Sequence, residues 1–165
     1  MKKLLFLSLL LLAFSTTYGQ SLVLDTITGK YKSTGIVQVD SLKKDIIFSK
    51  TKEWIALNYK SSKDVIQLSD KENSKIILKG AFLANLFMKE GWIEHSLVFD
   101  FKDGKFRYSY SDFSYFSTGS GKMFFESNSL GFKKKIFSTT ESNIASSIES
   151  LKKYLLDNSK KNSDW

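Results

Sequence analysis

The sequence predicts an α+β fold in which two helices pack on one face of an antiparallel sheet. Three observations lead to this prediction. Strand-like runs of apolar residues cluster in the middle of the chain, between residues 64 and 113. An amphipathic helical pattern precedes the cluster at residues 41–59, and a second one follows it at residues 138–157. Strands that are clustered between two helices are typical of α+β domains, because alternating α/β folds interleave the two kinds of element.

Residues 92–113 predict a long β-hairpin around the turn Lys102-Asp103-Gly104-Lys105. Asp-Gly between alternating runs is a strong hairpin signal, because both central residues of a type I′ turn need a positive φ. The turn sets the register, and we expect an aromatic face that forms the core and a second, more polar face. The expected cross-strand pairs are Phe101 with Phe106, Phe99 with Tyr108, Leu97 with Tyr110, Asp100 with Arg107 and Val98 with Ser109.

The first helix is expected to be capped by Asp40 or Ser41 and to end near Tyr59. It follows a strand at residues 35–39, in which Val37 and Val39 share one side. Its apolar period predicts three buried side chains, which are Ile47, Trp54 and Ile55.

A second hairpin is predicted from residues 64–68 and 74–79, joined by a polar turn. Residues 81–89 are ambiguous between strand and helix, and we favour a strand because a helix there would lack a cap. The last helix begins at Ser138-Thr139-Thr140-Glu141, which matches a capping box. Its apolar stripe consists of Ile144, Ile148, Leu151 and Leu155.

The N-terminus has the form of a secretory signal peptide: Met1-Lys2-Lys3 precede an apolar run at residues 4–14. That run is shorter than the roughly 20 residues of a spanning helix, so an uncleaved anchor is the less favoured alternative. The small residues Thr17 and Gly19 place the cleavage between Gly19 and Gln20. We therefore predict a signal peptide at 1–19, a single α+β domain at 20–157 and a frayed C-terminal tail at 158–165. The mature chain is expected to be periplasmic or secreted, and not membrane-spanning.

Composition excludes several classes of chemistry. The chain has no cysteine, which rules out disulfides, thiolate metal sites and cysteine nucleophiles. The net charge is +8, but Arg107 is the one arginine among 25 basic residues. Nucleic-acid readers favour arginine for bidentate contacts, so no nucleic-acid partner is expected. An envelope protein or a glycan is the class of partner that suits an exported chain.

His95 is the single histidine, and the hairpin register places it opposite Asp112 on the same face. An Asp–His pair can orient a general base, yet Ser96 and Ser111 should point to the other face because strand residues alternate. One histidine leaves only carboxylates as metal ligands, and Asp100, Asp103 and Asp112 lack the spacing of a calcium loop. No catalytic residue, metal or cofactor is therefore predicted.

The segment 113–137 mixes glycine and serine with aromatic residues, and we interpret it as an irregular loop. Aromatic side chains on such a loop are hard to bury, which makes them candidates for contact with a partner or ligand. The candidates are Tyr115, Phe116, Phe124, Phe125 and Phe132.

Four blocks of sequence form a recognisable pattern: GIVQV at 35–39, KEWIALNYKSS at 52–62, VIQLSDKE at 65–72 and DFKDGKFRY at 100–108. They resemble an exported bacterial domain of unknown function with a TATA-binding-protein-like (TBP-like) fold. The resemblance covers about residues 35–113, and the last helix matches only in position. It implies the TBP-like fold and an exported Gram-negative context. It supplies no activity and no catalytic residues, and a fold label alone does not imply DNA binding.

The favoured functional hypothesis is a non-enzymatic binding or interaction domain of the cell envelope. The aromatic loop and the open sheet face would be its contact surfaces. One alternative is an envelope hydrolase that uses carboxylates or the Asp112–His95 pair. A further alternative is a purely structural envelope component.

Overall fold

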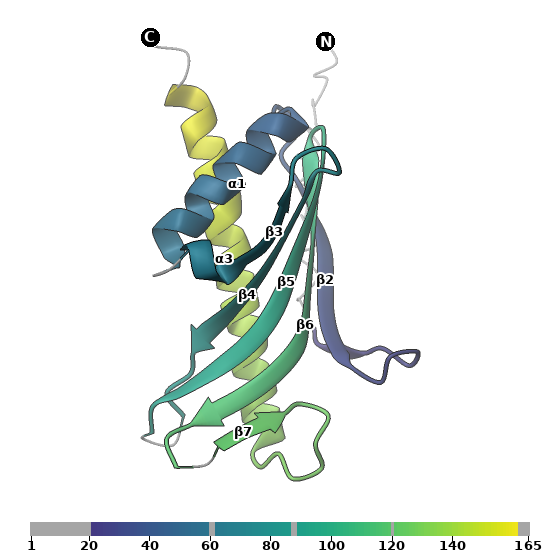
Figure 1. The fold of residues 1–165 in the computed structure, drawn as a ribbon, viewed down its shortest axis with the longest axis vertical. Helices are drawn as coiled ribbons and strands as arrows, with labels where there is room; N and C mark the ends of the chain where they lie inside the picture. Colours follow the sequence, from purple (N-terminus) through teal and green to yellow (C-terminus); the bar gives the residue numbers. More distant parts are fainter. Residues whose placement is uncertain (1–20, 60–61, 87–88, 120, 162–165) are drawn as a thin grey trace, which may run out of the picture.

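The computed structural model describes residues 21–59, 62–86, 89–119 and 121–161 (Figure 1). Along the chain the helices are α1 (Lys44–Asn58), α2 (Ser62–Val65) and α3 (Lys133–Lys161). The strands are β1 (Val23–Leu24), β2 (Tyr31–Gln38), β3 (Ile66–Asp70), β4 (Lys75–Leu83), β5 (Gly91–Lys102), β6 (Lys105–Ser117) and β7 (Gly121–Phe124).

The strands form one seven-stranded antiparallel sheet in the order β1-β2-β6-β5-β4-β3. Strand β2 pairs with residues 105–110 of β6, and β7 pairs with residues 114–117 of the same strand. The long helix α3 runs along the sheet with α1 beside it (Figure 1). This arrangement confirms the predicted α+β class. The opposite face of the sheet has no helix over it in the described part of the chain, and we call it the open face.

The central hairpin has the predicted register. All five expected pairs are present, from Phe101 opposite Phe106 to Leu97 opposite Tyr110. The aromatic residues of this set are buried under the helices, and Ile47, Trp54 and Ile55 of α1 are buried against them. Burying aromatic side chains of this size contributes on the order of 1.5–3 kcal/mol each, so this layer accounts for much of the stability.

The helix starts differ from the prediction. Helix α1 begins at Lys44, and the backbone N–H of Lys44 donates to Asp103 Oδ1 at 2.8 Å. The predicted caps Asp40 and Ser41 are therefore wrong, because the hairpin turn supplies the capping carboxylate from another part of the chain. Helix α3 begins at Lys133, five residues before the predicted box. Within it, Ser138 Oγ donates to the carbonyl of Lys135 at 3.0 Å, as a helix-interior serine does.

Four other segments also have predicted structures that can be compared with the observed ones. Residues 113–117 continue β6 and residues 121–124 form β7, so the expected irregular loop is wrong over these positions. The strand favoured for residues 81–89 is confirmed for 81–83, where β4 ends. The predicted stripe of Ile144, Ile148, Leu151 and Leu155 is buried. Helix α3 continues to Lys161, into the segment expected to be a tail.

Gly35 makes close packing of the central aromatic layer possible. It pairs with Tyr108, and a Cβ at Gly35 would lie 2.2 Å from the Tyr108 hydroxyl oxygen. We predict that Gly35→Ala lowers the free energy of unfolding by roughly 1–3 kcal/mol, the usual cost of overpacking a core. Urea unfolding followed by circular dichroism measures this change. Gly131→Ala is the matched control, because a Cβ there meets nothing within 4 Å; equal losses in both variants would contradict the packing argument.

Candidate functional site

His95 lies in the core on the helix-covered side of the sheet. Its ring stacks on Phe82 with centroids 4.2 Å apart and meets Tyr110 edge-on at 5.0 Å. The Nδ1 atom lies 3.3 Å from the carbonyl oxygen of Ile93, which can only accept, so neutral His95 donates from Nδ1. Burial lowers the pKa of His95 to about 4, and its Nε2 has no hydrogen-bond partner among the described residues. His95 is therefore an uncharged core side chain at neutral pH.

Asp112 lies on the other side of the sheet, so the predicted pairing with His95 is wrong. The register of β5 and β6 shifts between Glu94 and Ser96, and Asp112 takes a φ of +55° at the irregularity. This extra residue turns the carboxylate to the open face, where Lys30 Nζ lies 2.5 Å from Asp112 Oδ1. The hydrogen bond from Lys30 lowers the pKa of Asp112 below its ordinary value. The two groups cannot act as an Asp–His pair across the sheet.

The buried histidine predicts a pH dependence of stability. In the unfolded chain His95 binds a proton near its ordinary pKa of 6.5, whereas the folded chain resists protonation down to about 4. The unfolded state therefore holds more protons in this window, and stability falls as the pH falls, by at most roughly 1.4 kcal/mol per pH unit.

Urea unfolding at a series of pH values from about 6.5 to about 4.5 measures the effect, because most paired carboxylates lose their contribution only at lower pH. His95→Phe removes the titrating group and keeps a ring in the same layer. Its unfolding free energy should be nearly constant over this range. An equal slope in both proteins would show that another group is responsible.

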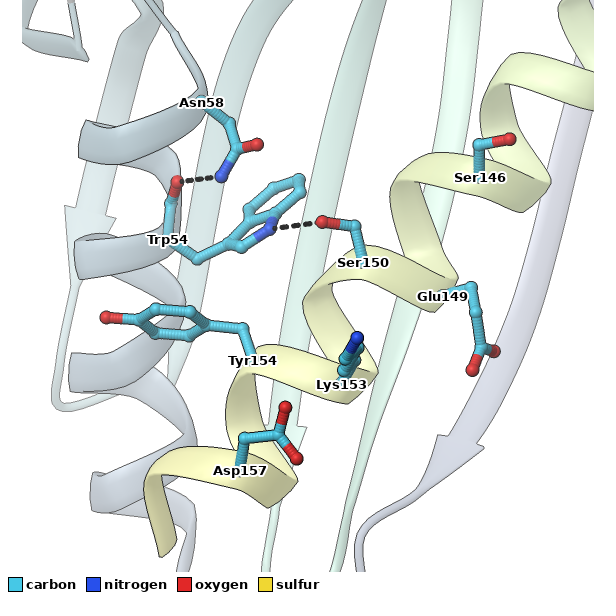
Figure 2. A pocket seen from close by; sticks show the side chains of 8 residues that line it. All are labelled: Trp54, Asn58, Ser146, Glu149, Ser150, Lys153, Tyr154 and Asp157. Carbon is cyan, nitrogen blue, oxygen red and sulfur yellow. Dashed lines mark hydrogen bonds between the residues drawn. The ribbon is translucent and has the colours of Figure 1, made fainter. Parts of the chain in front are cut away.

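A groove of about 560 Å³ lies between α1 and α3 (Figure 2). Its polar groups connect the two helices: Trp54 Nε1 donates to Ser150 Oγ at 3.1 Å, and the Tyr154 hydroxyl donates to Glu53 Oε2 at 3.1 Å. Figure 2 shows Trp54 and Tyr154 lying between the helices, with Asn58 bonded back to the Trp54 carbonyl. These contacts identify the groove as a helix–helix junction.

The open face carries an exposed apolar group at the end of the sheet remote from the Asp103-Gly104 turn. The register aligns Leu83, Trp92 and Phe116 in one row across β4, β5 and β6. Trp92 and Phe116 stack with centroids 5.8 Å apart, and Phe124 of β7 lies in the next row. Phe116 is 38% exposed, Phe124 57% and Leu83 60%. We call Leu83, Trp92, Phe116 and Phe124 the open-face patch.

A hollow of about 550 Å³ adjoins this patch. The hollow is lined by small side chains, among them Ala81 and Ser96, and by the longer side chains of Glu94 and Lys122. Lys122 Nζ lies 2.5 Å from Glu94 Oε2, and this bond lowers the pKa of Glu94 below its ordinary value. The Ser114 hydroxyl also donates to Glu94 at 3.1 Å. The charges of Glu94 and Lys122 thus neutralise each other at the side of the hollow that adjoins the aromatic patch.

The five aromatic residues predicted to contact a partner fall into two groups. Tyr115 and Phe125 are buried, so the expectation that they are exposed on a loop is wrong. Phe116, Phe124 and Phe132 are exposed. The difference arises because 113–124 contains strands, in which neighbouring side chains point to opposite faces. The same alternation, applied to β5 from His95 backwards, would have placed Trp92 on the open face with Glu94.

Phe132 stands apart from the open-face patch, at the start of α3. It precedes the run Lys133-Lys134-Lys135, and its carbonyl accepts the backbone N–H of Lys135 at 2.9 Å. Lys133 Nζ lies 5.0 Å from the centre of the Tyr31 ring, a cation–π contact. The predicted candidates therefore do not form a single surface.

Within residues 21–59, 62–86, 89–119 and 121–161, no three carboxylate or histidine side chains gather into a group that could hold a metal ion. Among those residues, no helix combines the length and the apolar character needed to cross a membrane.

The arrangement of one antiparallel sheet with two long helices on one face is that of TBP-like proteins. The chain superposes on a TBP-like protein from Parabacteroides distasonis with a TM-score of 0.66 and 14% identity, over 80% of this chain and 96% of the other. It superposes on a DUF4468 family protein from Bacteroides ovatus with a TM-score of 0.60 and 13% identity, over 81% and 93% of the two chains. No curated protein matches.

Residues 34–116 match the model of a family described as a domain of unknown function (DUF4468) with TBP-like fold. The match covers half of the chain, and the chain belongs to this family. The resemblance to a domain of unknown function with a TBP-like fold, and the α+β fold predicted from the sequence, are thereby confirmed. The matched region begins within β2 and ends at Phe116 of β6, so it includes Leu83, Trp92 and Phe116 of the open-face patch.

Proposed function

We propose that this protein is a non-enzymatic binding domain of the bacterial cell envelope that holds another protein against the open face of its sheet. The observation that carries the proposal is the open-face patch, in which the stacked rings of Trp92 and Phe116 lie beside exposed Leu83 and Phe124. A contiguous group of large apolar side chains on one face is characteristic of an interaction surface. Tryptophan and phenylalanine are also enriched at protein interfaces.

The other end of the open face carries ion pairs between its strands. Near the Asp103-Gly104 turn, Arg107 Nη2 lies 2.8 Å from Asp100 Oδ2, and Lys75 Nζ lies 3.6 Å from the other oxygen. These charged groups stay hydrated, as on an ordinary sheet surface. Ile36 and Leu68 are also exposed on this face, but the stacked rings lie at the other end, where a partner would displace water from a group of large apolar side chains.

An enzymatic role for the Asp112–His95 pair has no support, because the two side chains lie on opposite faces of the sheet. Glu94 and Asp112 are each held by a lysine, Lys122 and Lys30, which favours their charged forms. A carboxylate kept ionised is poorly suited to act as a general acid at neutral pH. These features favour binding over hydrolysis at this surface.

We predict that Phe116→Ser and Phe124→Ser each weaken partner binding without unfolding the domain. Both side chains are partly exposed, so their replacement should change stability by less than about 0.5 kcal/mol. The measurement is the yield of a covalent adduct from a photoreactive phenylalanine analogue at Trp92, irradiated in envelope preparations of the native bacterium. Leu57→Ser is the control, since Leu57 is 72% exposed on α1 in the helical layer. An adduct that survives both phenylalanine substitutions would contradict the proposal.

The envelope location rests on the signal-peptide pattern, and the predicted cleavage at Gly19 and Gln20 lies outside the described residues. We expect the protein recovered from the envelope or the medium to begin at Gln20, which intact-mass measurement would reveal as loss of residues 1–19. Replacing Leu9 and Leu10 by Lys within the apolar run should abolish export and leave the full-length chain inside the cell. Recovery of an unprocessed native chain in the cytoplasm would disprove this location.

A further inference from the structure

Part of strand β4 forms the outer edge of the sheet. Strand β3 pairs with β4 only along residues 75–78, and its register ends where Ile66 meets Leu78. Strand β5 pairs with the other side of β4 through Leu83. Residues 79–83 therefore have a strand on one side only, within the part of the chain that the structure describes. In Figure 1 this stretch is the lower half of β4, at the margin of the sheet.

The register shows which peptide groups face outward. The backbone N–H of Ala84 donates to Gly91 O at 2.8 Å, and that of Phe101 donates to Ser74 O at 2.9 Å. Both pairs belong to the β4–β5 register, so the even-numbered residues of β4 are bonded to β5. In an antiparallel ladder the intervening residues point their N–H and C=O to the other side. Ala81 and Leu83 thus direct their N–H and C=O groups to the exposed edge, whereas the N–H of Lys79 flanks the Ile66–Leu78 pair and points toward the start of β3.

Helix α2 contacts β4 where β3 begins, but the rest of this edge lacks most of the features that protect natural edges. Proline is absent from the whole chain, and no register shift interrupts β4 along its pairing with β5. Lys79 is the one charged residue among positions 79–83, where the sequence reads KGAFL. An apolar edge strand with regular unpaired peptide groups is a template for another strand.

We propose that residues 79–83 of β4 take up an extended segment of the partner protein as an additional antiparallel strand. This inference rests on the proposed function and specifies how that partner binds. The added strand would continue the sheet beside Leu83, so its open-face side chains would extend the open-face patch. Strand β3 lies on the same side of β4, which limits the segment to about five residues before it meets Ile66.

The side chains at the edge define the chemistry of the segment. Lys79, Ala81 and Leu83 are exposed on the open face, and alternate residues of an added strand would lie beside them. The residue beside Leu83 should be apolar, and the residue beside Lys79 should be acidic. The residue beside Ala81 can be large, because the 550 Å³ hollow opens over that small side chain. The expected pattern, read from the N-terminus of the segment, is apolar, any, large, any, acidic.

The test uses Ala81→Pro with Ala81→Val as the matched control. Proline removes the outward N–H of position 81 and is tolerated on an edge, because that N–H makes no bond to β5. Valine changes the side chain and keeps the donor. Circular dichroism and urea unfolding establish that both variants fold.

The probes are peptides selected by the purified protein from a random twelve-residue display library. We expect the selected peptides to carry the apolar–large–acidic alternation and to bind Ala81→Pro about tenfold or more weakly, with Ala81→Val close to the parent protein. Peptide addition should slow hydrogen exchange at the amides of Ala81 and Leu83 more than at those of Gly80 and Phe82, whose N–H groups already bond to β5. This readout stands even where Ala81→Pro fails to fold.

Three results would overturn the inference: no enriched peptide, equal affinity for the proline variant, or exchange protection elsewhere. A dimer in sedimentation analysis that Ala81→Pro makes monomeric would assign the edge to a second copy and also overturn it. The adduct at Trp92 separates this inference from the proposed function. If the adduct forms equally in Ala81→Pro, the partner binds the open-face patch without the edge. If peptides bind the edge and no adduct forms, the edge site stands and the proposed envelope partner does not.

Discussion

The rest of the structure depends on the turn at Asp103 and Gly104, which closes the central hairpin and also fixes the start of α1. Gly104 O accepts the N–H of Val39 at 2.7 Å, the N–H of Gly104 donates to Leu42 O at 2.8 Å, and Asp103 caps Lys44. One turn thereby sets the register of β5 and β6 and joins β2 and α1 to them. Because strand side chains alternate, that register decides which residues form the core and which form the open face.

A single irregularity changes the outcome further along the same hairpin. From the turn to Ser96 and Ser111 the pairing follows the simple register, and beyond it Asp112 occupies an extra position. If the simple register continued past Ser111, Asp112 would lie opposite His95 in the core and Phe113 would point to the open face. The bulge instead buries Phe113 and keeps Phe116 on the surface. It therefore both separates the Asp–His pair and creates the aromatic row beside Trp92.

Local signals explain why much of the fold was predictable. The Asp-Gly turn needs a positive φ and acts over adjacent residues, so the five hairpin pairs followed from sequence alone. The helix starts did not, because the cap of α1 comes from Asp103, which is far away in sequence. The bulge at Asp112 has no glycine to mark it, and a residue other than glycine at φ of +55° is not apparent from composition. Tyr115 and Phe125 are buried for this reason, because the chain beyond the bulge continues as strand β6 and pairs with the segment that ends at Phe125.

The same geometry makes the two ends of the open face different. Near the turn, Asp100 is held between Arg107 and Lys75, and the edge of β4 is covered by β3. Away from the turn, β3 has ended, Trp92 and Phe116 stack beside the Lys122–Glu94 ion pair, and the small side chain of Ala81 leaves a hollow. Unpaired peptide groups and exposed rings thus occur together at one end of the sheet. An extended segment satisfies both at once, since its backbone pairs with β4 while its alternate side chains cover the rings.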